Sequence, residues 1–205
     1  MEAASFSDKP PAASGKRKPG ARKLQILQTL AAMLEDPKGE KVTTAALAAR
    51  LDVSEAALYR HFASKAQMFE GLIEFIETTI FGLINEISSK ETSGLKQVRR
   101  IVAMLLDFAQ TNRGMTRVLI GDALVNEHER LQERMNQLVD RIEASLKQSF
   151  RVAMTEKELP ETFDPAARAN LVVAYVVGRW HRFAKSGFKK LPNEALEAQL
   201  PALLV

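Results

Sequence analysis

The stretch from Thr43 to Lys65, TTAALAARLDVSEAALYRHFASK, indicates the fold of the chain. Thr43 and Thr44 offer hydroxyls to the free N–H groups of a helix start, and apolar residues then recur at helical spacing. Ser54 is a second N-cap residue, and it begins another short helix. Because neither helix is long enough to bury a core alone, the pair predicts a helix-turn-helix, whose second helix enters the major groove of DNA. Periodicity alone is equally compatible with an ordinary helical hairpin.

The ordered motif resembles the TetR-type regulators, whose signature is a Thr-led helix, an apolar-Val-Ser turn and an ending of the form LYxHFxSK. Asp52 departs from the family pattern, which has Gly because the turn needs positive φ; Asp tolerates that region better than most residues, so we expect the turn to form with some strain. The resemblance implies an all-α protein with an N-terminal three-helix helix-turn-helix domain and a C-terminal helical dimerisation domain. The matching residues are Thr43, Thr44, Val53, Ser54, Leu58, Tyr59, His61, Phe62, Ser64 and Lys65.

Docking geometry and this motif together predict the residues that meet DNA. We expect Ser54, Glu55 and Ala56, at the start of the second helix, to lie nearest the base edges. The predicted phosphate contacts are Thr43, Thr44, Tyr59, His61 and Lys65, and Arg60 is counted with the DNA-binding residues.

The net charge of +4 is concentrated at the N-terminus. Residues 1–24 contain six basic and two acidic groups, and the remaining 23 basic and 23 acidic groups cancel. We therefore predict a basic arm over residues 1–21 that follows phosphates or enters the minor groove, with Arg17 and Lys18 as contacts. A solvated tail is the alternative. Residues 22–66 then form the DNA-binding domain, and residues 67–205 form the dimerisation and partner-binding domain.

The composition excludes several classes of function. With 205 residues and 46% hydrophobic content, the chain is an ordinary globular protein that has no cysteine and three scattered histidines. No run approaches the roughly 18 apolar residues of a membrane span, so we expect a cytoplasmic protein without membrane contact. No nucleophile and base can be assembled, so we expect neither an enzyme nor a cofactor. Glu127, His128 and Glu129 are predicted to be solvated surface residues.

Helical periodicity continues to the C-terminus, with helices predicted over 24–36, 64–89, 95–111, 115–120, 122–153, 165–186 and 194–204. The helices over 64–89 and 95–111 are apolar beyond one face, which indicates either enclosure or a partner. Two long amphipathic helices near the C-terminus favour a four-helix interface between two copies of the chain, although packing within one copy is the alternative. Trp180 with Tyr175 fits either a core or a ligand cavity. The predicted dimer interface is Leu131, Met135, Leu138, Ile142, Val172, Val176 and Trp180.

Three stretches, SEAALYRHFASKAQMF, LIEFIE and HERLQERMNQLVDRIEASLKQ, are similar to the nucleoid-occlusion factors among the TetR-type regulators. This resemblance implies a homodimer, alone or as two dimers on one site, that reads a palindrome in double-stranded DNA and antagonises the division protein FtsZ. It also implies that the FtsZ C-terminal tail binds a groove lined by Phe75, Thr79, Leu83, Met104, Asp107, Phe108, Thr111 and Asn112. Leu83, Asp107 and Thr111 stand where basic side chains suit an acidic tail. The competing hypothesis is a repressor gated by a small hydrophobic ligand. If the chain is instead a nucleoid-occlusion factor, no small-molecule ligand is expected.

Overall fold

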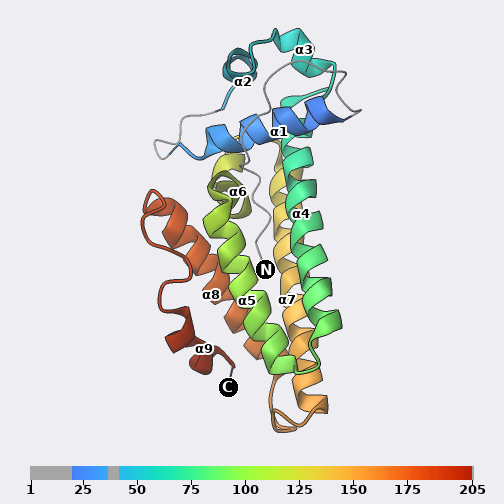
Figure 1. The fold of residues 1–205 in the computed structure, drawn as a ribbon, viewed down its shortest axis with the longest axis vertical. Helices are drawn as coiled ribbons and strands as arrows, with labels where there is room; N and C mark the ends of the chain where they lie inside the picture. Colours follow the sequence, from blue (N-terminus) through green and yellow to red (C-terminus); the bar gives the residue numbers. More distant parts are fainter. Residues whose placement is uncertain (1–19, 37–41, 205) are drawn as a thin grey trace.

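A small head of short helices lies across one end of a body of long helices (Figure 1). The computed structural model describes residues 20–36 and 42–204, and these two ranges contain helices and turns without a strand. None of the helices described is long and apolar enough to cross a membrane. The elements in chain order are α1 (Ala21–Leu34), α2 (Thr44–Arg50), α3 (Glu55–Tyr59), α4 (Lys65–Lys90), α5 (Gly94–Thr111), α6 (Arg113–Leu119), the 3-10 helix η1 (Asp122–Leu124), α7 (Glu129–Thr155), α8 (Pro165–Lys185) and α9 (Leu196–Leu204).

Several helix starts are fixed by local capping that the sequence predicts. Ser64 accepts a hydrogen bond from the Gln67 N–H at 3.2 Å, as a capping box requires. The return bond differs from the prediction, because the Gln67 side chain accepts from the Ala63 N–H at 2.8 Å instead of from Ser64. Asp164 caps α8, and Pro165 occupies its first turn, where a missing N–H costs nothing.

Helix α7 begins later than predicted. The sequence predicts a helix from Asp122, but Asp122–Leu124 forms η1, and α7 starts at Glu129 after the N-cap His128. Gly121 has φ 76° and Asn126 has φ 64°, and these left-handed residues interrupt the helix on both sides of η1. Residues 125–128 are therefore a connector between η1 and α7.

Helices α4, α5, α7 and α8 run along the long axis of the body and enclose one apolar core (Figure 1). The core contains all seven residues of the predicted dimer interface: Leu131, Leu138 and Val172 are 0% exposed, Met135, Val176 and Trp180 are 1% exposed, and Ile142 is 2% exposed. The amphipathic stripe of α7 and α8 is thus covered within one subunit.

Trp180 is a core residue. Its indole N–H donates to the Leu105 carbonyl oxygen of α5 at 3.1 Å, which satisfies the one polar group of the ring. The space beside the ring, between Val139 and Val177, has no room for a water molecule. Of the two roles considered for Trp180, the structure supports packing.

Candidate nucleic-acid interface

The helix-turn-helix is built from two capped helices and a left-handed turn residue. The Thr43 hydroxyl accepts from the Ala46 N–H at 3.1 Å, and the Ser54 hydroxyl accepts from the Ala57 N–H at 3.3 Å. Asp52 has φ 54°, which confirms the predicted positive φ at this turn. Leu47 and Leu58 are both 1% exposed, so the apolar sides of α2 and α3 are buried against the rest of the head.

The opposite side of this motif faces solvent. Ser54, Glu55 and Ala56 are exposed at the start of α3, and Arg60 is exposed just after its end. Tyr59 is 45% exposed. This side of the motif is therefore accessible to another molecule. Arg17 and Lys18 of the predicted arm lie outside the described residues.

One residue predicted to meet phosphate is engaged within the head. The Thr44 hydroxyl donates to the Glu55 carboxylate at 2.6 Å, which ties the start of α2 to the start of α3. Thr43 is exposed, and His61 is half-buried.

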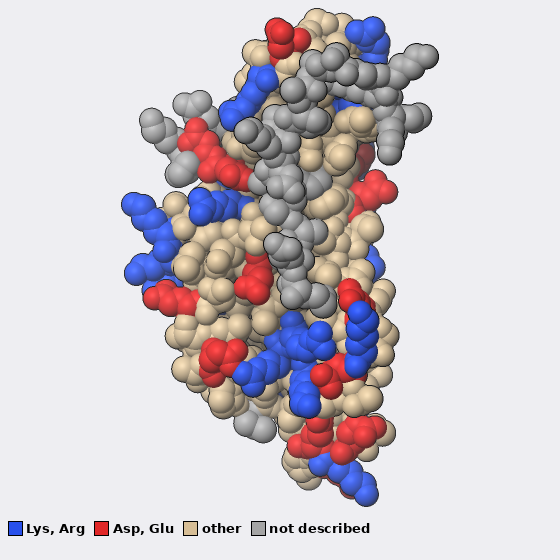
Figure 2. All heavy atoms as spheres, viewed as in Figure 1, with Lys and Arg blue, Asp and Glu red and all other residues tan. Residues whose placement is uncertain are grey.

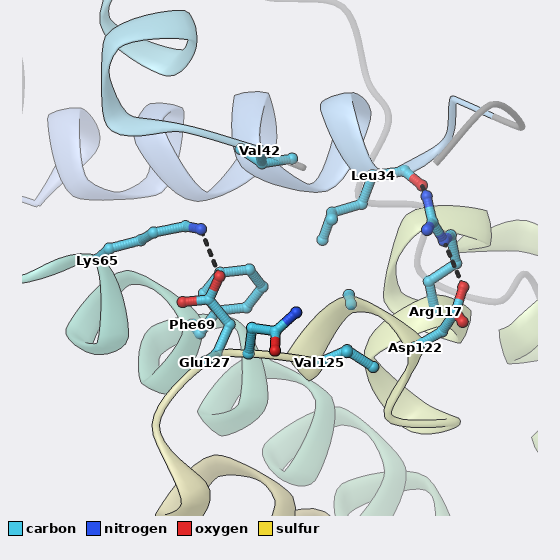
Figure 3. Close-up of a pocket in the computed structure, with 10 residues that line it drawn as sticks. Leu34, Val42, Lys65, Phe69, Arg117, Asp122, Val125 and Glu127 are labelled. Atoms are coloured by element: carbon cyan, nitrogen blue, oxygen red, sulfur yellow. Dashed lines mark hydrogen bonds and ion pairs between the residues drawn. The ribbon is translucent and has the colours of Figure 1, made fainter. Parts of the chain in front are cut away.

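Lys65, the first residue of α4, is also engaged inside the protein. Its ammonium forms an ion pair with Glu127 of the connector and lies 5.6 Å from the centre of the Phe69 ring. The exposed fraction of the Glu127 side chain is only 11%, so the prediction of a solvated Glu127 is wrong, while His128 and Glu129 are exposed as predicted. Figure 3 shows the Lys65 side chain extending toward Glu127 beneath α1.

A second polar contact joins the head to the body, across a cavity that Lys65 and Arg117 both line. Arg117 of α6 donates to the Leu34 carbonyl oxygen at 3.4 Å, where α1 ends (Figure 3). It also donates to the Asp36 carbonyl oxygen at 3.2 Å. Its Nε lies 3.2 Å from Asp122, which also pairs with Lys185. Burial acts to raise the pKa of the Asp122 carboxyl, but the hydrogen bonds and charges of Lys185 and Arg117 outweigh it and lower the pKa.

The close approach of α6 to α1 depends on Gly114. A Cβ atom at this position would lie 2.0 Å from the Ala31 carbonyl oxygen. Glu35, which follows α1, is half-buried beside this contact; burial raises the pKa of its carboxyl, and the charge of Arg113 opposes the rise. The contact between α1 of the head and α6 of the body therefore leaves no room for a side chain at position 114.

Charged pairs also join α4 to α7 along the body. Arg134 donates two hydrogen bonds to Glu77, at 3.0 and 2.6 Å, and the bond to Glu77 raises the pKa of the guanidinium further above neutrality. Arg130 pairs with Glu70 at 2.6 Å. Together with Lys65–Glu127, these pairs fix α4, the helix that leaves the head, against α7.

The residues predicted to line a partner groove lie along α4 and α5, but they are not equally accessible. Phe75, Thr79 and Leu83 on α4 are half-buried, as are Met104 and Thr111 on α5, and Asp107 is exposed. Phe108 and Asn112 are 1% and 3% exposed, so neither presents a surface. Instead, the Asn112 amide donates to the Phe108 carbonyl oxygen at 2.9 Å, where α5 ends and α6 begins. The Asp107 carboxylate accepts from Asn193 at 3.1 Å.

The outer face of α7 and α8 combines apolar and small residues. Leu171 is 50% exposed, Ala174 and Gly178 are exposed on the same side of α8, and nothing lies within 4 Å of a Cβ built on Gly178. A shallow groove of about 360 Å³ runs beside them, with Val139 and Val177 in its lining. Ala174 and Gly178 therefore leave this part of α8 without a large side chain.

Sequence reasoning missed two residues that position the head, Glu127 and Arg117. Their partners are 62 residues away for Glu127 and 83 and 81 residues away for Arg117. Periodicity within one helix carries no signal for such pairs. On the face drawn in Figure 2, basic and acidic side chains lie next to one another over the lower half of the molecule, and the described surface carries no large field of one sign there.

The geometry of the head, with its capped helix pair, left-handed turn and exposed second helix, defines a helix-turn-helix DNA-binding protein of the all-α class. Residues 37–72 match the family described as bacterial regulatory proteins, tetR family, and residues 90–205 match the tetracyclin repressor-like C-terminal domain. Several relatives carry the name nucleoid occlusion factor SlmA. That of Idiomarina loihiensis is 51% identical over 87% of this chain and 91% of its own length. That of Alteromonas mediterranea is 47% identical over 88% of this chain and 93% of its own length. The chain belongs to the TetR family, within the group of SlmA nucleoid occlusion factors.

Solved structures share the fold at low sequence identity. The fatty acid degradation regulator FadR of Bacillus halodurans superposes with a TM-score of 0.76 at 12% identity, over 92% of this chain and 97% of that one. FadR of Bacillus subtilis, solved in complex with stearoyl-CoA, gives a TM-score of 0.71 at 11% identity, over 88% of this chain and 97% of that one. At such low sequence identity, these similarities concern the fold alone.

Proposed function

We propose that the chain is a nucleoid occlusion factor that binds palindromic chromosomal sites as a homodimer and antagonises FtsZ assembly over the nucleoid. The observation that carries this proposal is the 51% identity over 87% of the chain to a relative with that name. On this proposal the protein works in the cytoplasm, on the nucleoid.

The head supplies the DNA-binding surface on this proposal. Ser54, Glu55 and Ala56 are exposed at the start of α3, which is the end of a recognition helix that meets base edges. Tyr59 and Arg60 follow at the rim, where side chains meet phosphates and set affinity more than sequence preference.

A second copy of the chain docks on the outer face of α7 and α8. Leu171, Ala174 and Gly178 form an apolar strip, and the small residues Ala174 and Gly178 let two helices approach closely. A two-fold interface pairs this strip with its own copy. It carries both heads on one dimer, as recognition of two half-sites requires.

The partner surface on this proposal is the strip between α4 and α5. Phe75 and Met104 are half-buried apolar side chains on the two helices, which lie side by side on one face of the body (Figure 1). The FtsZ C-terminal tail binds here, and the buried Phe108 and Asn112 support the strip from below. Leu83 and Thr111 leave the strip without a cation at these positions, so apolar contact contributes most of the binding.

The proposal is tested by fluorescence anisotropy of a labelled FtsZ C-terminal tail peptide added to the DNA-bound dimer. Phe75→Ala is expected to weaken peptide binding about tenfold, because a buried phenyl ring contributes about 1.5 to 3 kcal/mol. DNA affinity stays within about twofold, since Phe75 shares no side chain with the head. Leu191→Ala, which truncates a side chain that is 43% exposed elsewhere on the body, is the matched control and leaves both affinities unchanged.

The gated repressor predicts different results. A gating ligand has to change DNA affinity by a coupling free energy of about 1 to 3 kcal/mol. Release of DNA by a small hydrophobic molecule, without any binding of the tail peptide, refutes nucleoid occlusion. The filled space beside Trp180 supports nucleoid occlusion over gating.

A further inference from the structure

Lys65 is held by an acid that comes from outside the head. Its partner Glu127 belongs to the connector before α7, and the exposed fractions of the two side chains are 22% and 11%. The pair lies at one end of a cavity of about 210 Å³ between head and body, with Leu34, Val42 and Phe69 among the other lining residues (Figure 3). The cavity gives the Lys65 side chain space to move.

The Lys65 ammonium cannot serve Glu127 and a DNA phosphate together. Glu127 is enclosed at the junction, where a DNA backbone cannot enter, so Lys65 has to turn outward to reach a phosphate. Its four-carbon stem allows that turn without a change in the backbone. A carboxylate and a phosphate on the same ammonium would also repel each other across a few ångströms.

We propose that Glu127 sets the DNA affinity of this protein by competing with DNA phosphate for Lys65. This inference rests on the proposed DNA-binding function and adds a residue outside the head to it. Glu127 is a positioning residue: it holds Lys65 inward in the free protein, and each subunit has to break this pair when it binds DNA. Removal of the Glu127 charge therefore strengthens DNA binding.

The competition has a signature in the salt dependence of binding. When a free lysine neutralises a phosphate, counterions leave the DNA, and the slope of log K against log salt changes by about 0.9 for each contact. In the wild-type protein, transfer of Lys65 leaves the Glu127 carboxylate without its partner, and this carboxylate takes up a cation that offsets the release. The Lys65 contact then adds little to the wild-type slope. Without the Glu127 charge, the Lys65 contact contributes fully to the slope of log K against log salt.

The experiment measures anisotropy of a labelled duplex of about 30 base pairs, about three helical turns, bound by full-length protein across 50 to 200 mM salt. Glu127→Gln is expected to tighten binding about threefold per subunit, the size typical of a partly exposed ion pair. The slope becomes steeper by about 0.9 per subunit. Glu70→Gln, which removes an equal charge from the neighbouring pair with Arg130, is the control and changes neither quantity.

A second background separates the competition from a general effect on folding. In Lys65→Met protein, Glu127→Gln is expected to change neither the affinity nor the slope, because the contested cation is gone. A residue needed only for packing behaves differently: its loss lowers the melting temperature and weakens DNA binding in both backgrounds. Circular dichroism melts of all variants accompany the titrations.

Each remaining outcome overturns the inference. If wild-type protein binds the duplex and Glu127→Gln binds equally or less tightly with the same slope, the competition is wrong and DNA binding stands. If Glu70→Gln shows the same gain, the effect is general charge repulsion, and Glu127 has no special role. If wild-type protein does not bind the duplex, the proposed function fails and this inference fails with it.

Discussion

Replacement of Gly114 by alanine tests whether the head is fixed on the body as the structure describes. The new Cβ atom would lie 2.0 Å from the Ala31 carbonyl oxygen and 3.2 Å from the Leu34 Cβ. A carbon–oxygen contact normally measures about 3.3 Å or more, so α6 and α1 have to separate by about 1 Å. The first collision is with a backbone atom, which cannot move aside by changing a rotamer. The head is therefore expected to shift as a unit.

The cost of this shift follows from the packing. Overfilling a packed site costs about 1 to 3 kcal/mol, and a backbone collision belongs at the upper end of that range. Replacing a helical glycine by alanine returns at most about 1 kcal/mol. The net loss of about 2 kcal/mol corresponds to a melting temperature lower by about 4 to 8 °C for a chain of this size. DNA affinity is also expected to fall, because the bonds from Arg117 to the end of α1 lengthen.

Differential scanning calorimetry and DNA titration measure the two effects. Gly82→Ala is the matched control, since nothing lies within 4 Å of a Cβ built on this glycine of α4. The control is expected to melt at the wild-type temperature or slightly above it. Equal melting temperatures for Gly114→Ala and Gly82→Ala would refute the close contact between α1 and α6.

Three further predictions concern the dimer face, pH and the turn of the head. Ala174→Glu is expected to give a folded protein that sediments as a monomer, because this residue is exposed on the proposed dimer face. Leu138→Glu is instead expected to lose several kcal/mol of folding stability, because it buries an unpaired charge. A dimeric Ala174→Glu protein contradicts the proposed face. Glu35→Gln is expected to raise the melting temperature at pH 7. Burial raises the folded-state pKa of the Glu35 carboxyl, so the wild-type protein loses stability as pH rises through that pKa. Below the ordinary pKa of 4.5 the melting temperatures of the two proteins are expected to converge. An equal difference in melting temperature at pH 7 and below pH 4.5 would exclude titration of Glu35 as its cause. Asp52→Gly raises the urea midpoint, because φ 54° costs a non-glycine residue up to about 1 kcal/mol, and an unchanged midpoint means that Asp52 fits this turn without strain.

The capping pattern and the turn were predictable because they depend on a few consecutive residues. Thr43, Ser54 and Ser64 each accept a hydrogen bond from an N–H three residues later, and Asp52 adopts the positive φ that the family motif requires. Helical periodicity likewise identified which side of each long helix is apolar. The late start of α7 was not predicted, because Asn126 adopts a left-handed conformation that the residues around it in the sequence do not indicate.

Partner choice between distant elements depended on the tertiary structure. Periodicity marked Leu138 and Val176 as buried, but it carries no information on whether the covering surface belongs to the same subunit or to a second one, and the structure covers both within one chain. Lys65 illustrates the same limit for charge. The motif predicts its position at the start of α4, while its ion pair with Glu127 exists only because folding brings the connector before α7 beneath the head. An apolar side chain or a charge is satisfied by whichever group the fold places nearest, and that distance is set by the packing of whole helices.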